Sequence, residues 1–297
     1  MPMNTKTILG LLRVKHYIKN LFIFIPVFFA GKVEMATSVE LALAFLSFSM
    51  AASTIYIWND VKDILADREH PVKKFRPIPA GLVSIRSAYI ISFATLLIAL
   101  FCGYNLGYLA LFIVSSYIVL NIFYSYSWKH IAILDVSIIS CGFLLRVFLG
   151  GVAGGVDISR WLIIMVFLLS LGLAFGKRYD DVLLTEGGIQ KNIRKSIINY
   201  SAVFLRNAIV TVFTISTVCY LLYSMNITGE NIVSSKNFYL TSFPVIIGIL
   251  RYLAIIFTEE KSGSPTEVLL NDRFLQISLL IWILSILYFL YFNAQAI

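Results

Sequence analysis

Residues 41–67 read LALAFLSFSMAASTIYIWNDVKDILAD. An apolar run long enough to cross a bilayer, which takes about 20 residues, continues directly into Asn59, Asp60, Asp63 and Asp67. Acidic side chains at the edge of a membrane-spanning run are costly, so they indicate a functional site rather than packing. This stretch therefore predicts a transmembrane helix that carries a carboxylate cluster at one membrane boundary.

The composition extends this pattern to the whole chain. Of 297 residues, 59% are hydrophobic and 13% are charged, and the mean hydropathy is +0.85. Soluble domains hold roughly 45–50% apolar and about 25% charged residues, so a water-soluble globule is excluded. The three cysteines lie far apart in apolar runs without a nearby histidine, which predicts neither a disulfide framework nor a zinc site.

Nine apolar segments reach the length expected of membrane helices. They cover residues 18–33, 38–58, 84–104, 106–126, 133–151, 158–177, 203–225, 237–257 and 273–293. The predicted fold class is an all-α polytopic membrane protein, with one domain over residues 1–297. The N-terminus does not resemble a cleaved signal, because Arg13, Lys15 and Lys19 precede only a short apolar run.

The distribution of basic residues predicts the orientation of these helices. With the N-terminus in the cytoplasm, only Lys32, Arg160 and Lys236 fall on the far side of the membrane. Because Lys and Arg are enriched in cytoplasmic loops, we expect the N-terminus inside and the C-terminus outside. The net charge of +8 favours binding of anionic head groups or anionic substrates over binding of nucleic acid.

The three aspartates after the apolar run predict a metal site. At about 100° per residue they fall within an arc of roughly 60° on one helix face, where their charges repel. A divalent cation complements such a face, and oxygen ligands without His or Cys favour Mg²⁺, which completes its shell with substrate phosphates. The predicted metal ligands are Asn59, Asp60, Asp63 and Asp67, of which the first three are the predicted catalytic residues. A solvated helix end is the alternative.

The loop at residues 68–81, REHPVKKFRPIPAG, follows this motif directly. Its three prolines stiffen the chain around Lys73, Lys74 and Arg76. Arg supplies a two-pronged donor and Lys a point charge for phosphate oxygens, so this loop suits a diphosphate. A loop that is basic only because it is cytoplasmic explains part of the charge but not the adjoining acids.

The NDxxDxxxD run at 59–67, the RPIPAG at 76–81 and the nine spans resemble the UbiA superfamily of intramembrane prenyltransferases, whose members hold a diphosphate through Mg²⁺ at the first motif. Several segments look most like the decaprenyl-phosphate phosphoribosyltransferases: RVKHYIKN (13–20), 135–151, GKRY (176–179), IRKS (193–196) and SPTE (264–267). Those enzymes move 5-phosphoribose from phosphoribosyl pyrophosphate to a polyprenyl phosphate. The resemblance implies a nine-helix UbiA bundle in a bacterial inner membrane, with an active-site cavity that opens to the cytoplasm.

The resemblance also implies two sets of ligand-binding residues. The donor, phosphoribosyl pyrophosphate, is assigned to Lys19, Tyr56, Asn59, Asp63, Lys73, Lys74, Arg76, Tyr124 and Lys177. The acceptor, a polyprenyl phosphate, is assigned to Lys15, Lys19, Arg146, Lys177, Arg178 and Arg194. For the two tyrosines an aromatic belt at the membrane interface is an equal alternative. For Arg146 the alternative is a structural ion pair between helices.

The loop after residues 158–177 bears on the choice of substrate. Superfamily members that use a prenyl diphosphate carry a second DxxxD motif there, whereas this chain has KRYDD at 177–181, with Leu184 and Thr185 at the partner positions. The missing acids and the surplus of cations favour substrates with more phosphate groups. A UbiA-type aromatic prenyltransferase is the nearest alternative and a membrane transporter a more distant one. The sequence assigns no role to Asp180 and Asp181, and no oligomeric state.

Overall fold

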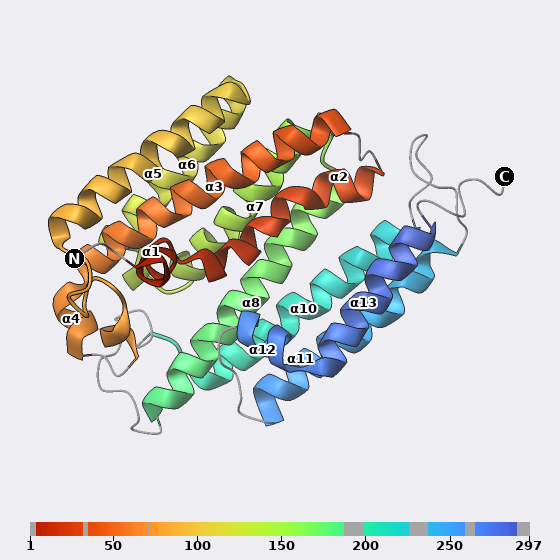
Figure 1. Cartoon of the computed structure of the whole chain (residues 1–297). Helices are drawn as coiled ribbons and strands as arrows, with labels where there is room; N and C mark the ends of the chain where they lie inside the picture. The colour runs from red at the N-terminus through yellow and green to blue at the C-terminus, as the bar shows by residue number, and fades with distance from the viewer. Residues whose placement is uncertain are drawn as a thin grey trace. The chain divides into compact units, whose positions relative to one another are not determined.

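The computed structural model describes residues 4–31, 35–69, 72–186, 199–225, 237–258 and 265–289. Every regular element in these ranges is a helix (Figure 1), which confirms the predicted all-α class. The helices form two compact units, Met1–Lys129 with Gly142–Ile158, and His130–Cys141 with Ser159–Ile297. Helix α7 (Leu134–Gly154) contributes its first turns to the second unit and the remainder to the first.

The first unit is built on three long helices, α3 (Met35–Lys62), α5 (Ile85–Asn105) and α6 (Tyr108–Tyr126), and Figure 1 shows α5 and α6 beside α3. The chain enters through α1 (Thr5–Leu12), the 3₁₀ helix η1 (Val14–Phe24) and α2 (Ile25–Ala30). Between α3 and α5 lie α4 (Ile64–Glu69) and η2 (Lys73–Phe75), and η3 (Trp128–His130) follows α6.

Hydroxyl side chains connect α3 to α5 inside this unit. The Ser47 hydroxyl donates to the Ala99 carbonyl at 2.7 Å, and the Thr54 and Thr95 hydroxyls lie 2.8 Å apart. In a membrane such bonds add roughly 0.6–2 kcal/mol each to helix association. The same unit contains a buried apolar core that includes Phe48, Ala51, Ile55, Val114 and Leu149.

The glycines of α7 allow a close approach of η1 and α2 within the first unit. A Cβ atom on Gly150 would overlap the Ile23 carbonyl, and one on Gly154 would overlap the Val27 side chain. Small residues at such spacing are typical of tightly packed membrane helices. The spacing of these glycines therefore serves helix packing.

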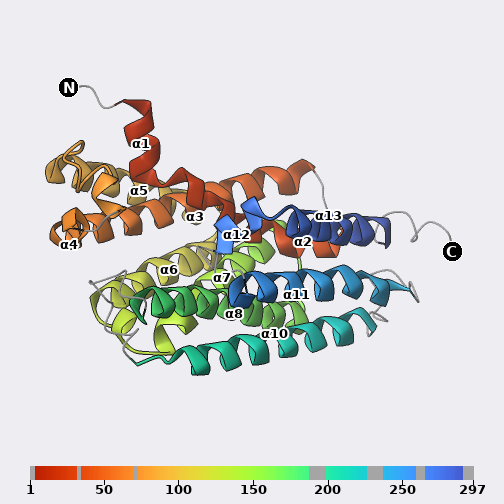
Figure 2. The ribbon, with the colours of Figure 1, turned by 90° about the horizontal axis from the view of Figure 1, so that it is seen from below.

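The second unit contains α8 (Arg160–Glu186), α10 (Ala202–Met225), α11 (Ser242–Thr258), α12 (Pro265–Asn271) and α13 (Arg273–Leu287), with η4 (Phe238–Thr241) before α11. Figure 2 shows α10 lying along α8, and the two helices are in extensive contact. A Cβ atom on Gly172 of α8 would lie 2.9–3.1 Å from ring carbons of Phe213 of α10. Glycine therefore lets these two helices pack closely.

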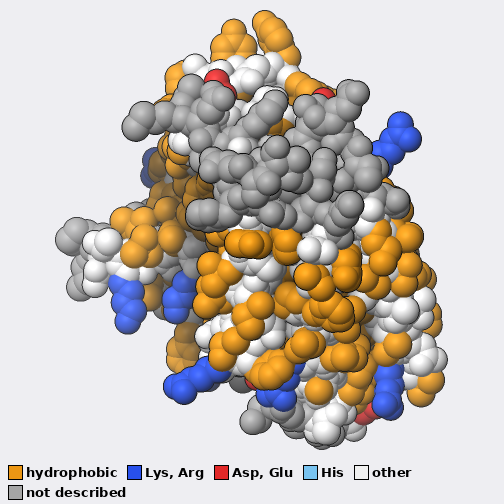
Figure 3. Space-filling model, turned by 90° about the vertical axis from the view of Figure 1, so that its right-hand side faces the viewer, with side chains coloured by type: hydrophobic (Ala, Val, Ile, Leu, Met, Phe, Trp, Pro, Cys, Tyr) orange, Lys and Arg blue, Asp and Glu red, His pale blue; other side chains and the backbone are white. Residues whose placement is uncertain are grey.

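Within the described residues, seven helices are long and apolar enough to cross a membrane. They are Thr37–Lys62, Ile85–Asn105, Tyr108–Tyr126, Leu134–Gly154, Arg160–Glu186, Ala202–Met225 and Phe238–Thr258. Several large apolar side chains are exposed on the helix surfaces, as expected for residues that face lipid. Tyr108 and Phe101, for example, are 80% and 69% exposed. Hydrophobic side chains also predominate on the face shown in Figure 3.

The other two of the nine predicted spans are shorter in the described structure. Residues 18–30 form the end of η1 and then α2, because Pro26 has no backbone N–H to continue a helical ladder from η1, and residues 32–33 of this span lie outside the described ranges. The last segment is the apolar α13, of 15 residues, and residues 290–293 of that span lie outside the described ranges. Nine full spans are therefore not observed in the described part of the chain.

Candidate active site

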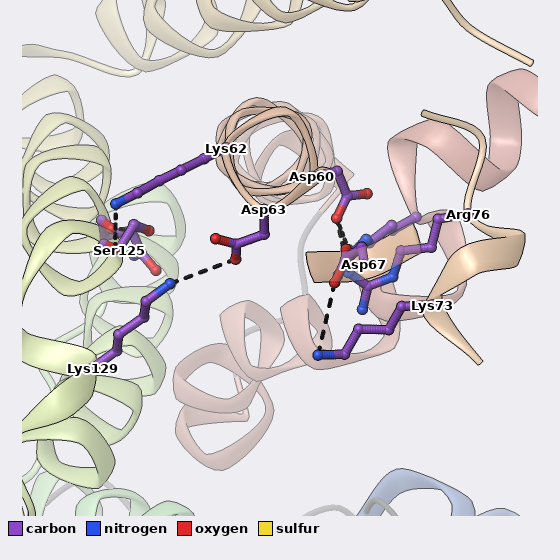
Figure 4. Close-up of polar contacts among 10 residues, drawn as sticks. Asp60, Lys62, Asp63, Asp67, Lys73, Arg76, Ser125 and Lys129 are labelled. Carbon is purple, nitrogen blue, oxygen red and sulfur yellow. Dashed lines mark hydrogen bonds and ion pairs between the residues drawn. The ribbon is translucent and has the colours of Figure 1, made fainter. Parts of the chain in front are cut away.

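Two of the predicted acids share one guanidinium group. Arg76 Nη1 donates to Asp60 Oδ1 at 3.0 Å and to Asp67 Oδ2 at 2.7 Å, and Lys73 Nζ lies 3.9 Å from Asp67 Oδ1. Figure 4 shows both carboxylates directed at Arg76. Asp60 is 1% exposed and Asp67 4% exposed. Buried acids require such partners, because an isolated charge in a low-dielectric environment is strongly destabilising.

A short, well-anchored turn holds Arg76 in place. The Ala80 N–H donates to the Arg76 carbonyl at 2.9 Å, and Gly81, with φ of +76°, closes the turn by donating to the Ile78 carbonyl at 3.0 Å. Ile78 and Val83 are buried in a cluster with side chains of α1 and α3. The RPIPAG segment therefore packs against the helix that carries Asp60.

Asp63 is separated from the other two acids. It occupies the turn between α3 and α4, and Figure 4 shows its carboxylate pointing away from Arg76 toward Lys129, whose Nζ lies 3.5 Å away. The neighbouring Lys62 Nζ donates to the Ser125 carbonyl at 2.7 Å. The first of these contacts joins the turn after α3 to η3, and the second joins the end of α3 to α6. Asp63 is also more open, with 42% of its side chain exposed.

Arg13 and Lys129 belong to this site, although neither was predicted as a site residue. The Arg13 guanidinium donates to Asp60 Oδ1 and lies 4.8 Å from the centre of the Tyr56 ring. Arg13 ends α1 in the left-handed conformation, with φ of 53°, which is uncommon for a residue other than glycine. The RVKHYIKN motif, which begins with Arg13, could have indicated that Arg13 belongs to the site. No sequence pattern near Lys129 or Asp63 indicates that these two residues pair.

A second group of polar residues surrounds Arg146 in the first unit. Arg146 Nε donates to Asn20 Oδ1 at 2.8 Å, and Nη1 donates to the Gly142 carbonyl at 2.7 Å. The guanidinium also lies 4.5 Å from the centre of the Phe48 ring, an arrangement that stabilises a desolvated cation. Within the described ranges no carboxylate pairs with Arg146, so the alternative of an interhelical ion pair is not supported there.

Lys19 belongs to the same group, in η1 and outside the seven candidate spans. Its burial, together with the nearby positive charges of Arg146 and Arg13, lowers the pKa of the Lys19 ammonium to about 8. Among the residues described here, no acid forms an ion pair with Lys19. A partly buried lysine beside other cations is electrostatically suited to receive an anion.

The remaining predicted residues of the first unit are more dispersed. Lys15 and Lys74 are exposed, and Asn59 and Tyr124 are half-buried. The Asn59 carbonyl accepts the Asp63 N–H at 2.9 Å, which continues the helical pattern through the turn. The structure therefore concentrates the predicted charges on Asp60, Asp67, Lys73 and Arg76.

In the second unit the predicted phosphate-binding residue Arg178 is engaged by two acids. Arg178 is 1% exposed, and its donors are occupied by Asp135 and Asp181, with N–O distances of 2.7 and 2.8 Å. Arg76 also contacts two carboxylates, but its side chain is 31% exposed and that of Arg178 only 2%, so a phosphate could approach Arg76 and not Arg178. Lys177 is exposed on α8, and Arg194 lies outside the described residues.

The carboxylate oxygens of Asp60 and Asp67 are suitable ligands for a Mg²⁺ ion that also binds a diphosphate. Within the described part of the chain, no three His, Cys, Asp or Glu side chains are grouped so that they could hold a metal ion. In diphosphate sites, however, Mg²⁺ takes only one or two carboxylates and completes its shell with phosphate oxygens and water. Asp60 and Asp67 supply such a pair, and all of its ligand atoms are oxygen.

Comparison with known proteins places this arrangement in a family. Residues 20–280 match the model of the UbiA prenyltransferase family. The chain belongs to the UbiA prenyltransferase family. The NDxxDxxxD motif that begins at Asn59 lies within the matched region.

Two relatives of this UbiA family chain align over most of its length. It is 36% identical over 287 residues to a Corynebacterium glutamicum protein named decaprenyl-phosphate phosphoribosyltransferase, covering 94% of this chain and 85% of the relative. It is also 36% identical over 296 residues to a Mycolicibacterium smegmatis protein of the same name, covering 95% and 91%.

A solved UbiA homologue from Archaeoglobus fulgidus, bound to GPP and Mg²⁺, has a similar fold. The TM-score is 0.71 and the identity 19%, and the alignment covers 95% of this chain and 97% of the homologue. This UbiA family chain is therefore an integral membrane protein of the UbiA fold.

Proposed function

We propose that this protein transfers 5-phosphoribose from phosphoribosyl pyrophosphate to a polyprenyl phosphate and releases diphosphate. The observation that carries the proposal is the 36% identity to a decaprenyl-phosphate phosphoribosyltransferase over 94% of the chain. The buried pair of acids bridged by Arg76 supports the same reaction class, because it combines metal ligands with a donor for phosphate oxygens.

The donor diphosphate is proposed to bind at Asp60 and Asp67. Mg²⁺ bound there with the diphosphate would neutralise the negative charge that develops on the leaving group. Arg76 and Lys73 already face these carboxylates, so a small change of side-chain direction would let them donate to phosphate oxygens. Asn59 and Asp63 stay in the proposal as further donor-binding residues, with Tyr56, Lys74 and Tyr124.

The reaction breaks the bond between C1 of the ribose and the diphosphate oxygen, and the electron pair leaves with the diphosphate. An oxygen of the polyprenyl phosphate forms the new bond to C1. Because this nucleophile is already an anion, no general base is needed. The residues of the chain contribute by positioning the reactants and by balancing charge.

The acceptor phosphate is proposed to bind at Lys19, with Arg146 behind it. Neither cation has an ion-pair partner among the described residues, and the polyprenyl chain would extend among apolar helices. Lys15, Lys177 and Arg194 stay in the proposal as further phosphate-binding residues. Arg178 is left out because two carboxylates neutralise it and only 2% of its side chain is exposed, against 31% for Arg76.

The finer membrane arrangement is also part of the proposal. We place the protein in a bacterial inner membrane as one domain over residues 1–297, with nine spans and the N-terminus in the cytoplasm. The excess of Lys and Arg in the loops on the N-terminal side supports this orientation. The active-site cavity then opens to the cytoplasm, where a soluble phosphorylated sugar donor is available.

The function is tested by donor choice. In the presence of Mg²⁺, phosphoribosyl pyrophosphate is expected to raise the melting temperature of the purified protein, because a ligand at a hundredfold excess over its Kd stabilises the native state by about 2.7 kcal/mol. With decaprenyl phosphate added, the lipid-linked phosphoribose and diphosphate should form in equal amounts. Product from geranyl diphosphate and an aromatic acid would overturn the proposal in favour of an aromatic prenyltransferase. No turnover of either donor would favour transport.

The acceptor site predicts a pH dependence. Lys19 loses its proton as the pH rises through about 8, so kcat/KM for the polyprenyl phosphate, which reports groups of the free enzyme, should fall above this pH. Lys19→Arg should remove the decline, because arginine stays protonated. Initial rates at limiting acceptor between about pH 6.5 and 9.5 provide the measurement. A wild-type profile that is flat to the upper end of this range would contradict the role of Lys19.

A further inference from the structure

The second unit contains a buried chain of charged groups that the proposed function does not use. Arg178 Nε donates to Asp135 Oδ2 at 2.7 Å, and Arg178 Nη1 donates to Asp181 Oδ2 at 2.8 Å. The Tyr200 hydroxyl donates to Asp135 Oδ1 at 2.8 Å and accepts the Ile133 N–H at 2.5 Å. These four side chains, Asp135, Arg178, Asp181 and Tyr200, are called the α8 network below.

Burial makes the geometry of the α8 network specific. Asp135, Arg178 and Tyr200 are 0%, 1% and 6% exposed. Removal of one partner would leave a buried charge uncompensated, which is strongly unfavourable. Burial, and the hydrogen bond to Asp135, raise the pKa of Tyr200, so its hydroxyl keeps its proton and remains a donor.

The backbone at one end of the α8 network is strained. Ile133 has φ of 67°, and the left-handed region is a true outlier for a β-branched residue. Such strain persists only where the surroundings impose the conformation, and it concentrates at functional sites. Here the Ile133 N–H is held by Tyr200, so the entry into α7 is set by the same bonds that hold α8.

The α8 network joins three segments that are far apart in the sequence. Asp135 lies at the start of α7, Arg178 and Asp181 lie in α8, and Tyr200 precedes α10. The Arg178–Asp135 bond connects α8 to the start of α7, whereas the Arg178–Asp181 bond lies within α8 and orients the Arg178 guanidinium. Lys177 immediately precedes Arg178 on this helix and is exposed, so the orientation of α8 limits where the Lys177 ammonium can reach.

We propose that the α8 network is a positioning device that fixes Lys177 for a phosphate group of the substrates, while none of its own side chains contacts that phosphate. This inference rests on the proposed function, which assigns Lys177 to phosphate binding. It also gives a role to Asp181, which the sequence left without one. Arg178 becomes a positioning residue instead of a binding residue.

Coupling to Lys177 is the decisive test. Lys177→Ala should lower kcat/KM for the polyprenyl phosphate about 10- to 100-fold, the loss of one charge-assisted contact. Asp135→Asn, which keeps the shape and removes the charge, should lower it by a similar factor, mainly through KM. In the Lys177→Ala background Asp135→Asn should have little further effect, because both changes remove the same contact.

Two other results would overturn the inference. A purely structural network predicts that Asp135→Asn costs the same factor with and without Lys177. Direct phosphate binding by Arg178 predicts that Arg178→Gln still lowers kcat/KM in the Lys177→Ala background, whereas Asp135→Asn alone leaves it unchanged or raises it. If Asp135→Asn does not purify, Tyr200→Phe replaces it, since this change removes both hydroxyl bonds and keeps the ring. Tyr239→Phe, at an exposed tyrosine of the same unit, is the matched control.

A second readout does not depend on turnover. In protein whose native cysteines are replaced by alanine, the thiol of Lys177→Cys is alkylated with a water-soluble maleimide. Tyr200→Phe is expected to change this alkylation rate at least about threefold, and Tyr239→Phe is expected to leave it unchanged. Equal rates in all three proteins would overturn the inference. A rate change, together with no phosphoribosyl transfer by the protein that retains Lys177, would instead show that the α8 network positions residue 177 while the proposed function is wrong.

Discussion

Asp60→Asn is expected to lower phosphoribosyl transfer by on the order of a thousandfold, which corresponds to about 4 kcal/mol of transition-state stabilisation. The change keeps the shape of the side chain but removes the charge that would hold Mg²⁺ and the diphosphate. Asp60 is also the carboxylate that both Arg13 and Arg76 contact, so its loss leaves both guanidinium groups without this partner. Diphosphate release from phosphoribosyl pyrophosphate, measured with saturating polyprenyl phosphate, gives the effect.

The matched control for this prediction is Asp157→Asn. Asp157 is an exposed acid of the same unit, so the same chemical change there should leave the rate within about twofold. Removal of Mg²⁺ with EDTA should reproduce the loss seen in Asp60→Asn, and added Mg²⁺ should restore only the wild type. If Asp60→Asn kept full activity, the acids bridged by Arg76 would not be the diphosphate site.

Arg76→Ala is expected to lower kcat/KM for phosphoribosyl pyrophosphate by on the order of a hundredfold, because charge-assisted hydrogen bonds contribute about 1.5–3 kcal/mol each. Arg76 Nη1 contacts both Asp60 and Asp67, and its loss would leave two buried acids to repel each other. The melting temperature should therefore fall as well. Steady-state kinetics with varied donor, and a thermal melt of the same preparation, provide the two measurements.

Arg86→Ala separates this effect from a general loss of positive charge. Arg86 lies at the exposed start of α5, so its removal changes the net charge equally without touching the acids. Arg76→Lys should recover part of the stability, since it retains the charge, but less of the donor affinity, since it lacks the planar fork. A donor KM that is unaltered in Arg76→Ala would exclude Arg76 from the donor site.

The sequence by itself determined the membrane class, most of the helices and the main acidic motif. Apolar runs of about 20 residues can satisfy their backbone only as helices in a bilayer, so seven predicted segments correspond to the seven observed spans. The NDxxDxxxD motif places Asp60 at the end of α3 and Asp67 in α4, but Asp63 lies in the turn between them, so the expectation that all three acids share one helix face was wrong. The RPIPAG segment was predicted beside them from its proximity along the chain.

Only the tertiary structure decided which charges meet. Arg13 reaches Asp60 across 47 residues, and Arg178 reaches Asp135 across 43. The same packing separates Asp63 from Asp60 and Asp67 by pairing it with Lys129. Helical periodicity specifies neighbours three and four residues apart, but it does not specify which distant element will neutralise a buried charge. That choice depends on how the helices pack, because each buried ion must find its partner in the folded chain.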